Sequence, residues 1–213
     1  AAGAVDLVTL PEPKLRQVRG GRIGMIFQEP MTSLNPVLSI GAQIAEVIRR
    51  HERVTRKAAR ARVVELLELV REAVRKDVPT LGHCLGGQLM SKALGGEVTR
   101  TRVKEIGWGQ VEVSDNSVAR GWFAPVTAFE SFHWHGEAFS IPPGATRVLG
   151  NAHCANQAFA TGKHLGLQCH IEMTEQLIRS WCRGGADEIR ESAASPGVQP
   201  PAKIVKNLET RVA

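Results

Sequence analysis

The chain has 213 residues, of which 43% are hydrophobic and 23% are charged, as is ordinary for a globular protein of one good-sized or two small domains. The formal net charge is +6, but the excess Lys and Arg lie mainly between Lys14 and Lys76, without interleaved aromatics, which favours a solvated helix face over a nucleic-acid site. The sequence shows no signal-peptide pattern, no apolar run of about 18 residues and no disulfide-framework spacing, so we expect a cytoplasmic protein without a membrane span.

The first part of the chain is rich in turn signals and then becomes helical. A short apolar run, Arg22-Ile-Gly-Met-Ile-Phe27, is compatible with a strand and ends at Gln28-Glu-Pro30. Helical patterns follow over residues 40–50 and from Thr55 to about Lys76, where Val63, Leu67, Val70 and Val74 share one face. Asp77-Val-Pro79 ends this helix.

The rest of the chain alternates between strand and helix patterns, which predicts an α/β sheet with flanking helices. Strands are expected over 78–82, 104–114, 129–134, 146–152 and 164–169, and helices over 86–94 and 174–191. Ser195-Pro-Gly-Val-Gln-Pro-Pro201 is predicted to be a linker.

Gly21-Arg-Ile-Gly-Met-Ile-Phe-Gln-Glu-Pro-Met-Thr-Ser-Leu-Asn-Pro36 resembles the ATP-binding subunits of oligopeptide and dipeptide ABC transporters, and the resemblance covers about residues 5–70. It implies that Gln28 corresponds to the Q-loop glutamine. A phosphate-binding loop with its Lys and a strand ending in Asp-Glu are both missing from the sequence. We therefore expect no ATP hydrolysis, although Leu85-Gly-Gly-Gln88 resembles a clipped transporter signature.

Gly82-His-Cys-Leu-Gly-Gly-Gln88 has the form of a nucleophile elbow between a predicted strand and a predicted helix. Glycines give the steric room for the sharp turn, and the helix N-terminus is expected to lower the pKa of the Cys84 thiol. The backbone N–H of Leu85 would then donate to an oxyanion. A base is available, since His170 and Glu172 alternate on one face of the strand-like segment Leu165-Gly-Leu-Gln-Cys-His-Ile-Glu172.

These motifs resemble the class I glutamine amidotransferases, above all the domain at the start of GMP synthase, over about residues 71–212. Trp134-His-Gly-Glu137 and Ile141-Pro-Pro-Gly144 add to the resemblance. It implies a flavodoxin-like sheet and a triad of Cys84, His170 and Glu172. It also implies that Gln88, His135 and Gly136 bind the substrate glutamine, whose ammonia passes to a synthetase partner.

Two departures from the family pattern are present. His-Ile-Glu stands where His-Pro-Glu is usual, and the transporter-like segment stands where the family has its first strands, one loop of which supplies a second oxyanion donor. We therefore expect two regions: residues 1–70, helical and turn-rich, and residues 71–213, a truncated amidotransferase-like domain. The alternative to an active enzyme is a non-catalytic hybrid or a transporter-derived interaction fragment without ATPase activity.

Neither a cofactor nor a metal is predicted. His133, His135, His153, Cys154 and Cys169 lack the paired spacing of a zinc site, and the alternation of His133 and His135 favours a hydrogen-bonded structural role. Cys154 and Cys182 are interpreted as small buried hydrophobic residues.

Overall fold

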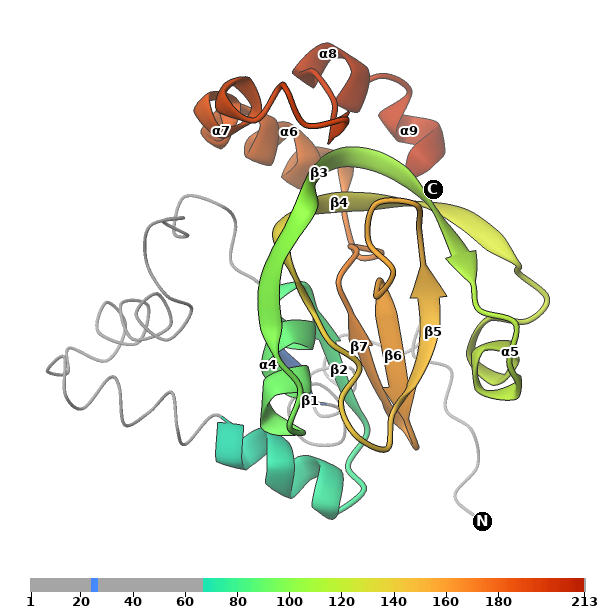
Figure 1. Cartoon of the computed structure of the whole chain (residues 1–213). Helices are drawn as coiled ribbons and strands as arrows, with labels where there is room; N and C mark the ends of the chain where they lie inside the picture. Colours follow the sequence, from blue (N-terminus) through green and yellow to red (C-terminus); the bar gives the residue numbers. More distant parts are fainter. Residues whose placement is uncertain (1–23, 27–66, 213) are drawn as a thin grey trace, which may run out of the picture.

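The structure, a computed structural model, describes residues 24–26 and 67–212, and of residues 24–26 only the backbone. These residues form one mixed sheet of eight strands with helices around it (Figure 1). The strands are β1 (Gly24–Ile26), β2 (Thr80–His83), β3 (Val98–Val113), β4 (Ala128–Phe139), β5 (Thr146–Gly150), β6 (Ala158–Thr161), β7 (His164–Leu167) and β8 (Gly197–Val198). The predicted α/β fold with flanking helices is confirmed.

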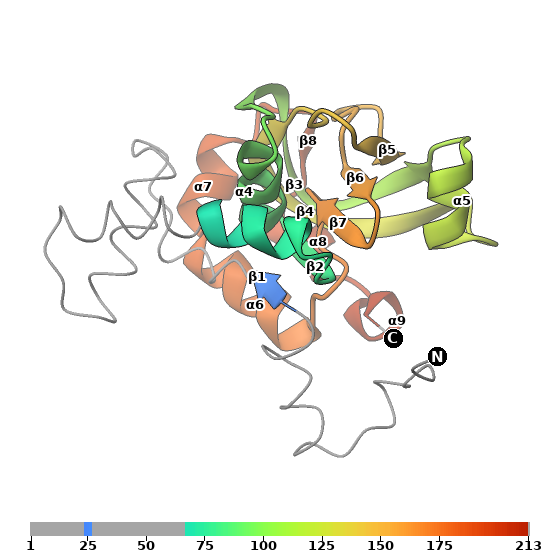
Figure 2. The same ribbon diagram turned by 90° about the horizontal axis from the view of Figure 1, so that it is seen from below.

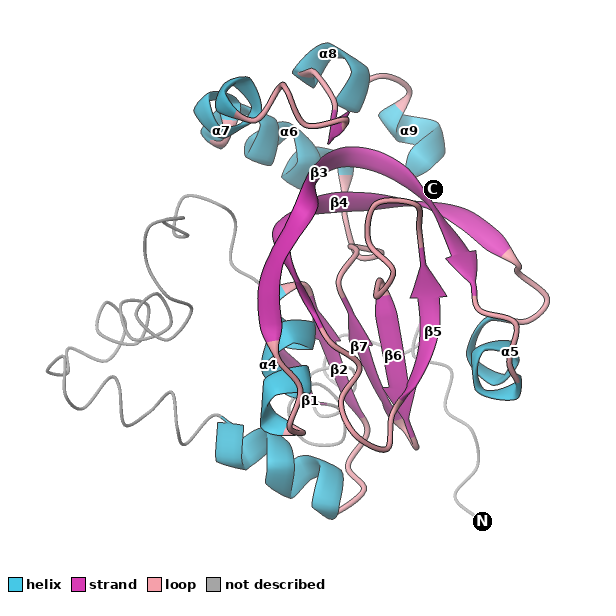
Figure 3. Cartoon of the chain, in the orientation of Figure 1, coloured by secondary structure: helices cyan, strands magenta, loops and turns pink. Residues whose placement is uncertain are grey.

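Helices flank the sheet on several sides. They are α4 (Leu85–Ala93), α5 (Ser117–Phe123), α6 (Glu175–Gly184), α7 (Ala186–Glu191), α8 (Pro201–Ile204) and α9 (Leu208–Arg211), together with helical residues 67–75. Figure 3 shows α6 to α9 together over the bend of β3 and β4, whereas α4 lies beside β2. No helix of residues 67–212 is long and apolar enough to cross a membrane.

The sheet joins a parallel part to an antiparallel part. Its order is β1-β2-β7-β6-β5-β3-β4, and β8 pairs with β3. β1 and β7 both run parallel to β2, with Gly24 opposite Thr80 and Leu81 opposite Leu165. Because parallel strands end at the same edge, the carboxyl ends of β2 and β7 come together. β1 belongs to the segment that resembles the transporter subunits, so residues 24–26 of that segment extend the sheet.

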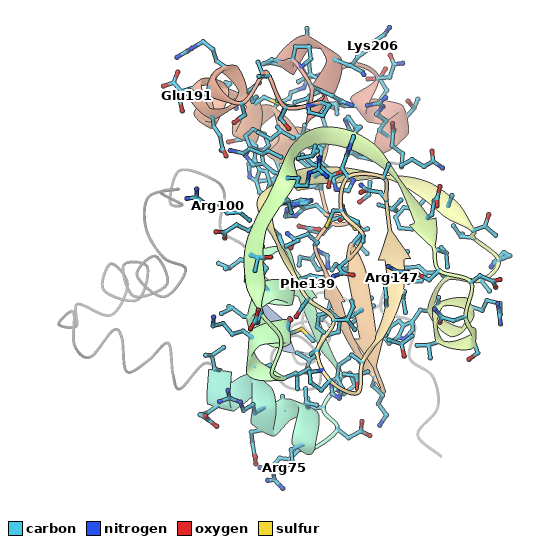
Figure 4. All side chains as sticks on the ribbon, in the orientation of Figure 1. Arg75, Arg100, Phe139, Arg147, Glu191 and Lys206 are labelled. Atoms are coloured by element: carbon cyan, nitrogen blue, oxygen red, sulfur yellow. The ribbon has the colours of Figure 1, made fainter. Side chains whose placement is uncertain are left out.

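Apolar side chains fill separate cores around the sheet. One core joins α6, α8 and α9 to β3 and β4 through Ile106, Phe132, Trp181, Ile204 and Leu208. Another joins residues 67–75 and α4 to β4 and β6 through Val70, Met90, Phe139 and Phe159. Figure 2 shows α4 and α6 on opposite sides of β2. In Figure 4 the labelled Phe139 lies in the interior, whereas the labelled Arg75, Glu191 and Lys206 lie at the periphery.

The C-terminal part is more ordered than its composition predicts. The expected linker over Ser195–Pro201 is wrong, since Gly197 and Val198 pair with β3 as β8. The side chain of Gln199 accepts from the backbone N–H of Trp108 at 3.0 Å and donates to its carbonyl at 2.6 Å. The single helix expected over 174–191 is two helices, α6 and α7, which meet at Gly185.

Some predicted elements lie outside the described residues. These are the helix over 40–50, the part of the second helix before residue 67, and Gln28 with the motif that follows it. Residues 67–75 are helical, and within them Val70 is buried, as the predicted apolar face requires.

Gly87 allows α4 to lie directly against β7. A Cβ at this position would approach the carbonyl oxygen of Leu167 to 2.5 Å, and a backbone atom cannot move aside as a side chain can. We expect Gly87→Ala to lower the free energy of unfolding by about 1–3 kcal/mol, the usual cost of overpacking. Gly121→Ala is the matched control, because it lies in α5 with open space around it. There alanine should stabilise the helix by up to about 1 kcal/mol. Urea unfolding of the two variants measures the difference, and equal stabilities would contradict the close helix–strand contact.

Candidate active site

Cys84 occupies a sharp turn between a strand and a helix. β2 ends at His83, α4 begins at Leu85, and Cys84 between them has φ 46° and ψ −105°. Such a positive φ is costly for a residue with a side chain and persists only where the surroundings hold it. A Cβ at Gly82 would lie 2.5 Å from the backbone carbon of Gly86, so glycine is needed at this close approach. The local geometry is that of a nucleophile elbow.

The Cys84 thiol faces polar groups from β4 and from the segment just after β7. Its Sγ donates to the carbonyl oxygen of Trp134 over 3.9 Å and accepts from Nε2 of Gln168 at 3.5 Å. The backbone N–H of Cys84 donates to Leu167 at 2.7 Å, which ties the elbow to the end of β7. The elbow therefore places the sulfur where β2, β4 and the segment after β7 meet.

The expectation that the helix N-terminus lowers the thiol pKa is wrong for this state. Cys84 is only 4% exposed, and burial raises the pKa of its thiol to about 12, although the Leu85 backbone N–H and Gln168 oppose the rise. Loss of hydration of the thiolate thus outweighs the helix N-terminus. Burial also raises the pKa of Cys154 to about 11 and of Cys169 to about 12, so thiol acidity alone does not distinguish Cys84.

His170 and Glu172 form a hydrogen-bonded pair just beyond β7. Nδ1 of His170 lies 2.7 Å from Oε1 of Glu172, while Nε2 of His170 is buried and has no hydrogen-bond partner among residues 67–212. The imidazole packs edge-on against Trp181, with ring centroids 5.1 Å apart. The backbone N–H groups of His170 and Phe132 each donate a hydrogen bond to the carbonyl oxygen of the other residue, which holds the segment after β7 against β4. No hydrogen bond joins the His170 imidazole to Sγ of Cys84 in the described part of the chain.

A second histidine shares the carboxylate of Glu172. Nδ1 of His83, the residue before Cys84, is hydrogen-bonded to Oε2 of Glu172. Burial raises the pKa of Glu172, but the hydrogen bonds with His170 and His83 lower it more, so that it lies well below its usual range. Glu172 is thus a carboxylate at neutral pH, and it links His83, at the end of β2, to His170.

The three predicted substrate-binding residues have different surroundings. Gln88 is buried, and its Nε2 donates to the carbonyl of Glu137 at 3.3 Å and to Oε1 of Gln168 at 3.1 Å. Nε2 of His135 lies 3.3 Å from Oε2 of Glu105. Gly136 borders the aliphatic part of Lys104. Gln88 thus shares Gln168 as a neighbour with Cys84, whereas His135 is directed at Glu105.

Sequence reasoning missed His83, Gln168 and Glu105. His83 directly precedes Cys84, and Gln168 lies two residues before His170, so their closeness to predicted triad residues could have marked both as candidates. Glu105 lies inside a long strand, where nothing in the sequence marks a buried carboxylate. Burial raises its pKa, but His135, His133 and Asn151 lower it more, so it too lies below its ordinary value.

Comparison with known proteins divides the chain into two parts. Over 65 residues it is 58% identical to the "Oligopeptide transport ATP-binding protein OppD" of Bacillus subtilis (strain 168), a match that covers 30% of this chain and 18% of that protein. Over 93 residues it is 44% identical to AppD of the same organism, covering 42% of this chain and 27% of AppD. These matches lie in the N-terminal region, so the predicted resemblance is confirmed. The chain spans about a quarter or less of either transporter protein.

The other part matches solved amidotransferases. A glutamine amidotransferase from Methylobacillus flagellatus superposes with a TM-score of 0.67 and 44% identity, covering 70% of this chain and 61% of that one. A second, from Thermotoga maritima, gives a TM-score of 0.60 and 34% identity, with coverages of 70% and 63%. The family profile "Glutamine amidotransferase class-I" matches residues 56–179, more than half of the 213 residues. The chain therefore belongs to the class I glutamine amidotransferase family.

Proposed function

We propose that this chain hydrolyses the side-chain amide of glutamine, with Cys84 as nucleophile, His170 as base and acid, and Glu172 as the group that orients His170. The observation that carries the proposal is the elbow at Cys84 beside a strand whose end bears the His170–Glu172 pair, in a chain of this family. Cysteine, imidazole and carboxylate in this order form the usual arrangement of a thiol triad.

The first half of the reaction forms a thioester. Nε2 of His170 accepts the thiol proton as Sγ of Cys84 bonds to the amide carbon of the substrate. The oxyanion that develops accepts a hydrogen bond from the backbone N–H of Leu85. The C–N bond then breaks, and the proton on His170 goes to the departing nitrogen, which leaves as ammonia. A γ-glutamyl thioester on Cys84 remains.

The second half returns the enzyme to its starting state. His170 takes a proton from water, the resulting hydroxide attacks the thioester carbon, and the C–S bond breaks. The proton returns to the sulfur and glutamate is released. Glu172 stays ionised throughout because its pKa lies below its usual range, so it stabilises the imidazolium in both halves.

The raised thiol pKa has a consequence for the first step. At neutral pH a thiol with a pKa near 12 is protonated in the resting state. Proton transfer to His170 therefore accompanies attack on the bound glutamine and does not precede it. Nε2 of His170 is suited to this, since within the described part of the chain it is the ring nitrogen that no group hydrogen-bonds.

The wider assignment is also a proposal. Residues 71–213 form the amidotransferase-like unit, in which Gln88, His135 and Gly136 contribute to glutamine binding. Residues 1–70 form the transporter-like part, for which we propose no nucleotide hydrolysis because the sequence has no phosphate-binding loop. The ammonia would pass to a synthetase partner in the cytoplasm.

A diazo-ketone analogue of glutamine tests the proposal. Incubation with the purified full chain should attach one analogue per chain at Cys84, as located by peptide mass spectrometry, and excess glutamine should protect the thiol. Iodoacetamide is the control reagent: it should modify Cys84 slowly at neutral pH, because the thiol is buried and protonated.

The two reagents separate the candidate functions. Labelling by the analogue that glutamine suppresses supports the enzyme. A folded chain that the analogue leaves unlabelled, and that releases no ammonia from glutamine, would make the non-catalytic hybrid the better description.

A further inference from the structure

Three potential metal ligands meet between the two longest strands. Glu105 on β3 is directly opposite His135 on β4, and Gly107 is opposite His133. The three side chains therefore come from two register positions that are two residues apart along each strand. One ligand atom from each of Glu105, His133 and His135 lies within 4.8 Å of the others. All three residues are more than nine-tenths buried, with exposures of 3%, 1% and 5%.

Three of the four histidine nitrogens of this cluster lack a hydrogen-bond partner among the described residues. Nε2 of His133 lies 3.4 Å from the carbonyl oxygen of Gly109, whereas Nδ1 of His133 and both ring nitrogens of His135 are buried and unpartnered within residues 67–212. Nε2 of His135 lies 3.3 Å from Oε2 of Glu105 but without the alignment of a hydrogen bond. Buried polar nitrogens are normally paired with protein, water or an ion, so three in one cluster point to a bound group.

Two side-chain amides donate hydrogen bonds to the Glu105 carboxylate. Asn151 donates to Oε1 at 2.6 Å, and Gln157 donates to Oε2 at 2.9 Å. Hydrogen bonds of this kind orient the ligands in metal sites, where ligating carboxylates are themselves hydrogen-bonded. Asn151 and Gln157 therefore fix the direction in which the carboxylate can offer its remaining lone pairs.

The cluster also has an open side. Glu105, His133 and Asn151 line a cavity of about 310 Å³, together with His153. A cation held by the three ligands would keep a coordination position for water on this side. Two imidazoles and one carboxylate with an open position match the ligand set of zinc centres that retain a water.

We propose that Glu105, His133 and His135 bind a divalent zinc ion. Imidazole and carboxylate donors together suit zinc better than calcium or magnesium, which prefer oxygen ligands. The site clamps β3 to β4 on the side of the cavity. It shares His135 with the proposed glutamine-binding residues, whereas neither Cys84 nor His170 belongs to it.

The test uses the full-length Cys84→Ser variant, so that the Cys84 thiol cannot bind metal. The protein is stripped with EDTA, freed of chelator, and titrated with Zn²⁺ by calorimetry. Co²⁺ serves as a second probe, because its visible absorption reports the coordination number. We expect one equivalent of Zn²⁺ to bind, an intense Co²⁺ spectrum of a four-coordinate site, and a higher Tm with excess Zn²⁺.

Variants in the same background locate the ion. Asn151→Ala removes a donor to the carboxylate and should weaken zinc binding about 10- to 100-fold. Glu105→Gln and His133→Gln should weaken it further. His153→Gln is the matched control, an exposed histidine beside the same cavity, and should bind zinc like its parent.

Two results would overturn the proposal. One is a folded parent that binds no stoichiometric Zn²⁺, in which case the cluster is only a structural hydrogen-bonded group. The other is binding that survives His133→Gln and Asn151→Ala. If Glu105→Gln fails to fold by circular dichroism, these two variants and the parent titration still decide the question.

Discussion

Cys84→Ala should lower the rate of glutamine hydrolysis by at least about 10⁴-fold. Removing the nucleophile of a triad eliminates the covalent route entirely, and the remaining groups act only weakly on water. The imidazole and carboxylate cannot compensate, because a thioester needs the sulfur at the elbow. Ammonia release under saturating glutamine, measured for the purified full chain and its variant, gives the ratio of kcat values.

Cys182→Ala is the control for this substitution. Cys182 is also buried, but it lies in α6 within the apolar core and not at the elbow. Its variant should keep the parent's activity and lose only modest stability, about 1 kcal/mol. Equal rates of ammonia release for the parent and Cys84→Ala would show that another group carries the reaction.

The elbow could be placed from sequence because its cause is local. The turn needs glycine close to the nucleophile, and Gly82 and Gly86 each lie two residues from Cys84 in the sequence. The helix after it differs from its predicted range by one residue at each end. Short-range steric limits and helix periodicity can both be read from one continuous stretch of sequence, which is why the turn at Cys84 and the helix after it could be predicted.

The contact between His83 and Glu172 could not be predicted in the same way. His83 and Glu172 are 89 residues apart and meet only because β2 and β7 are neighbours in the sheet. That pairing is a property of the whole topology. The prediction of a lowered thiol pKa was wrong for a related reason, because the burial of Cys84 depends on residues that are distant in the sequence.

The C-terminal segment shows how tertiary contacts override composition. Prolines and glycine in Ser195–Pro201 predict a linker, but β8 gains its partner from β3. Ile204 and Leu208, a few residues later, are completely buried in the core around Trp181. The break between α6 and α7 was also missed, although Gly184-Gly185 interrupts the helix pattern.

Glu172→Gln should lower kcat for glutamine hydrolysis by about 10³- to 10⁴-fold, with a small change in KM. Replacing a triad carboxylate by its amide keeps the shape but removes the charge that stabilises the imidazolium. The amide also has only one oxygen for two histidines. If its NH₂ group faces His170, the Nδ1 there becomes the acceptor, and Nε2 then carries the proton and cannot take one from Cys84.

His83 provides the comparison for this variant. His83→Gln keeps a donor for Oε2 of Glu172, so kcat should fall only about tenfold or less. His83→Leu removes the partner of that oxygen on a half-buried carboxylate, at a cost of about 1–3 kcal/mol in stability. Urea unfolding at pH 7 measures this loss, and a His83→Leu variant as stable as the parent would show that the pair does not stabilise the ionised Glu172.

The lowered pKa of Glu172 also links this site to stability. A carboxyl with a folded-state pKa below its ordinary value of 4.5 stabilises the fold above that pH, and this contribution is lost as the pH falls towards the folded-state pKa. The parent's free energy of unfolding should therefore decline below about pH 4.5. Glu172→Gln cannot titrate, so its decline over the same range should be shallower. Urea unfolding at about pH 5, 4 and 3 measures both slopes, and parallel curves would mean that the hydrogen bonds from His83 and His170 do not hold the carboxylate in its ionised form.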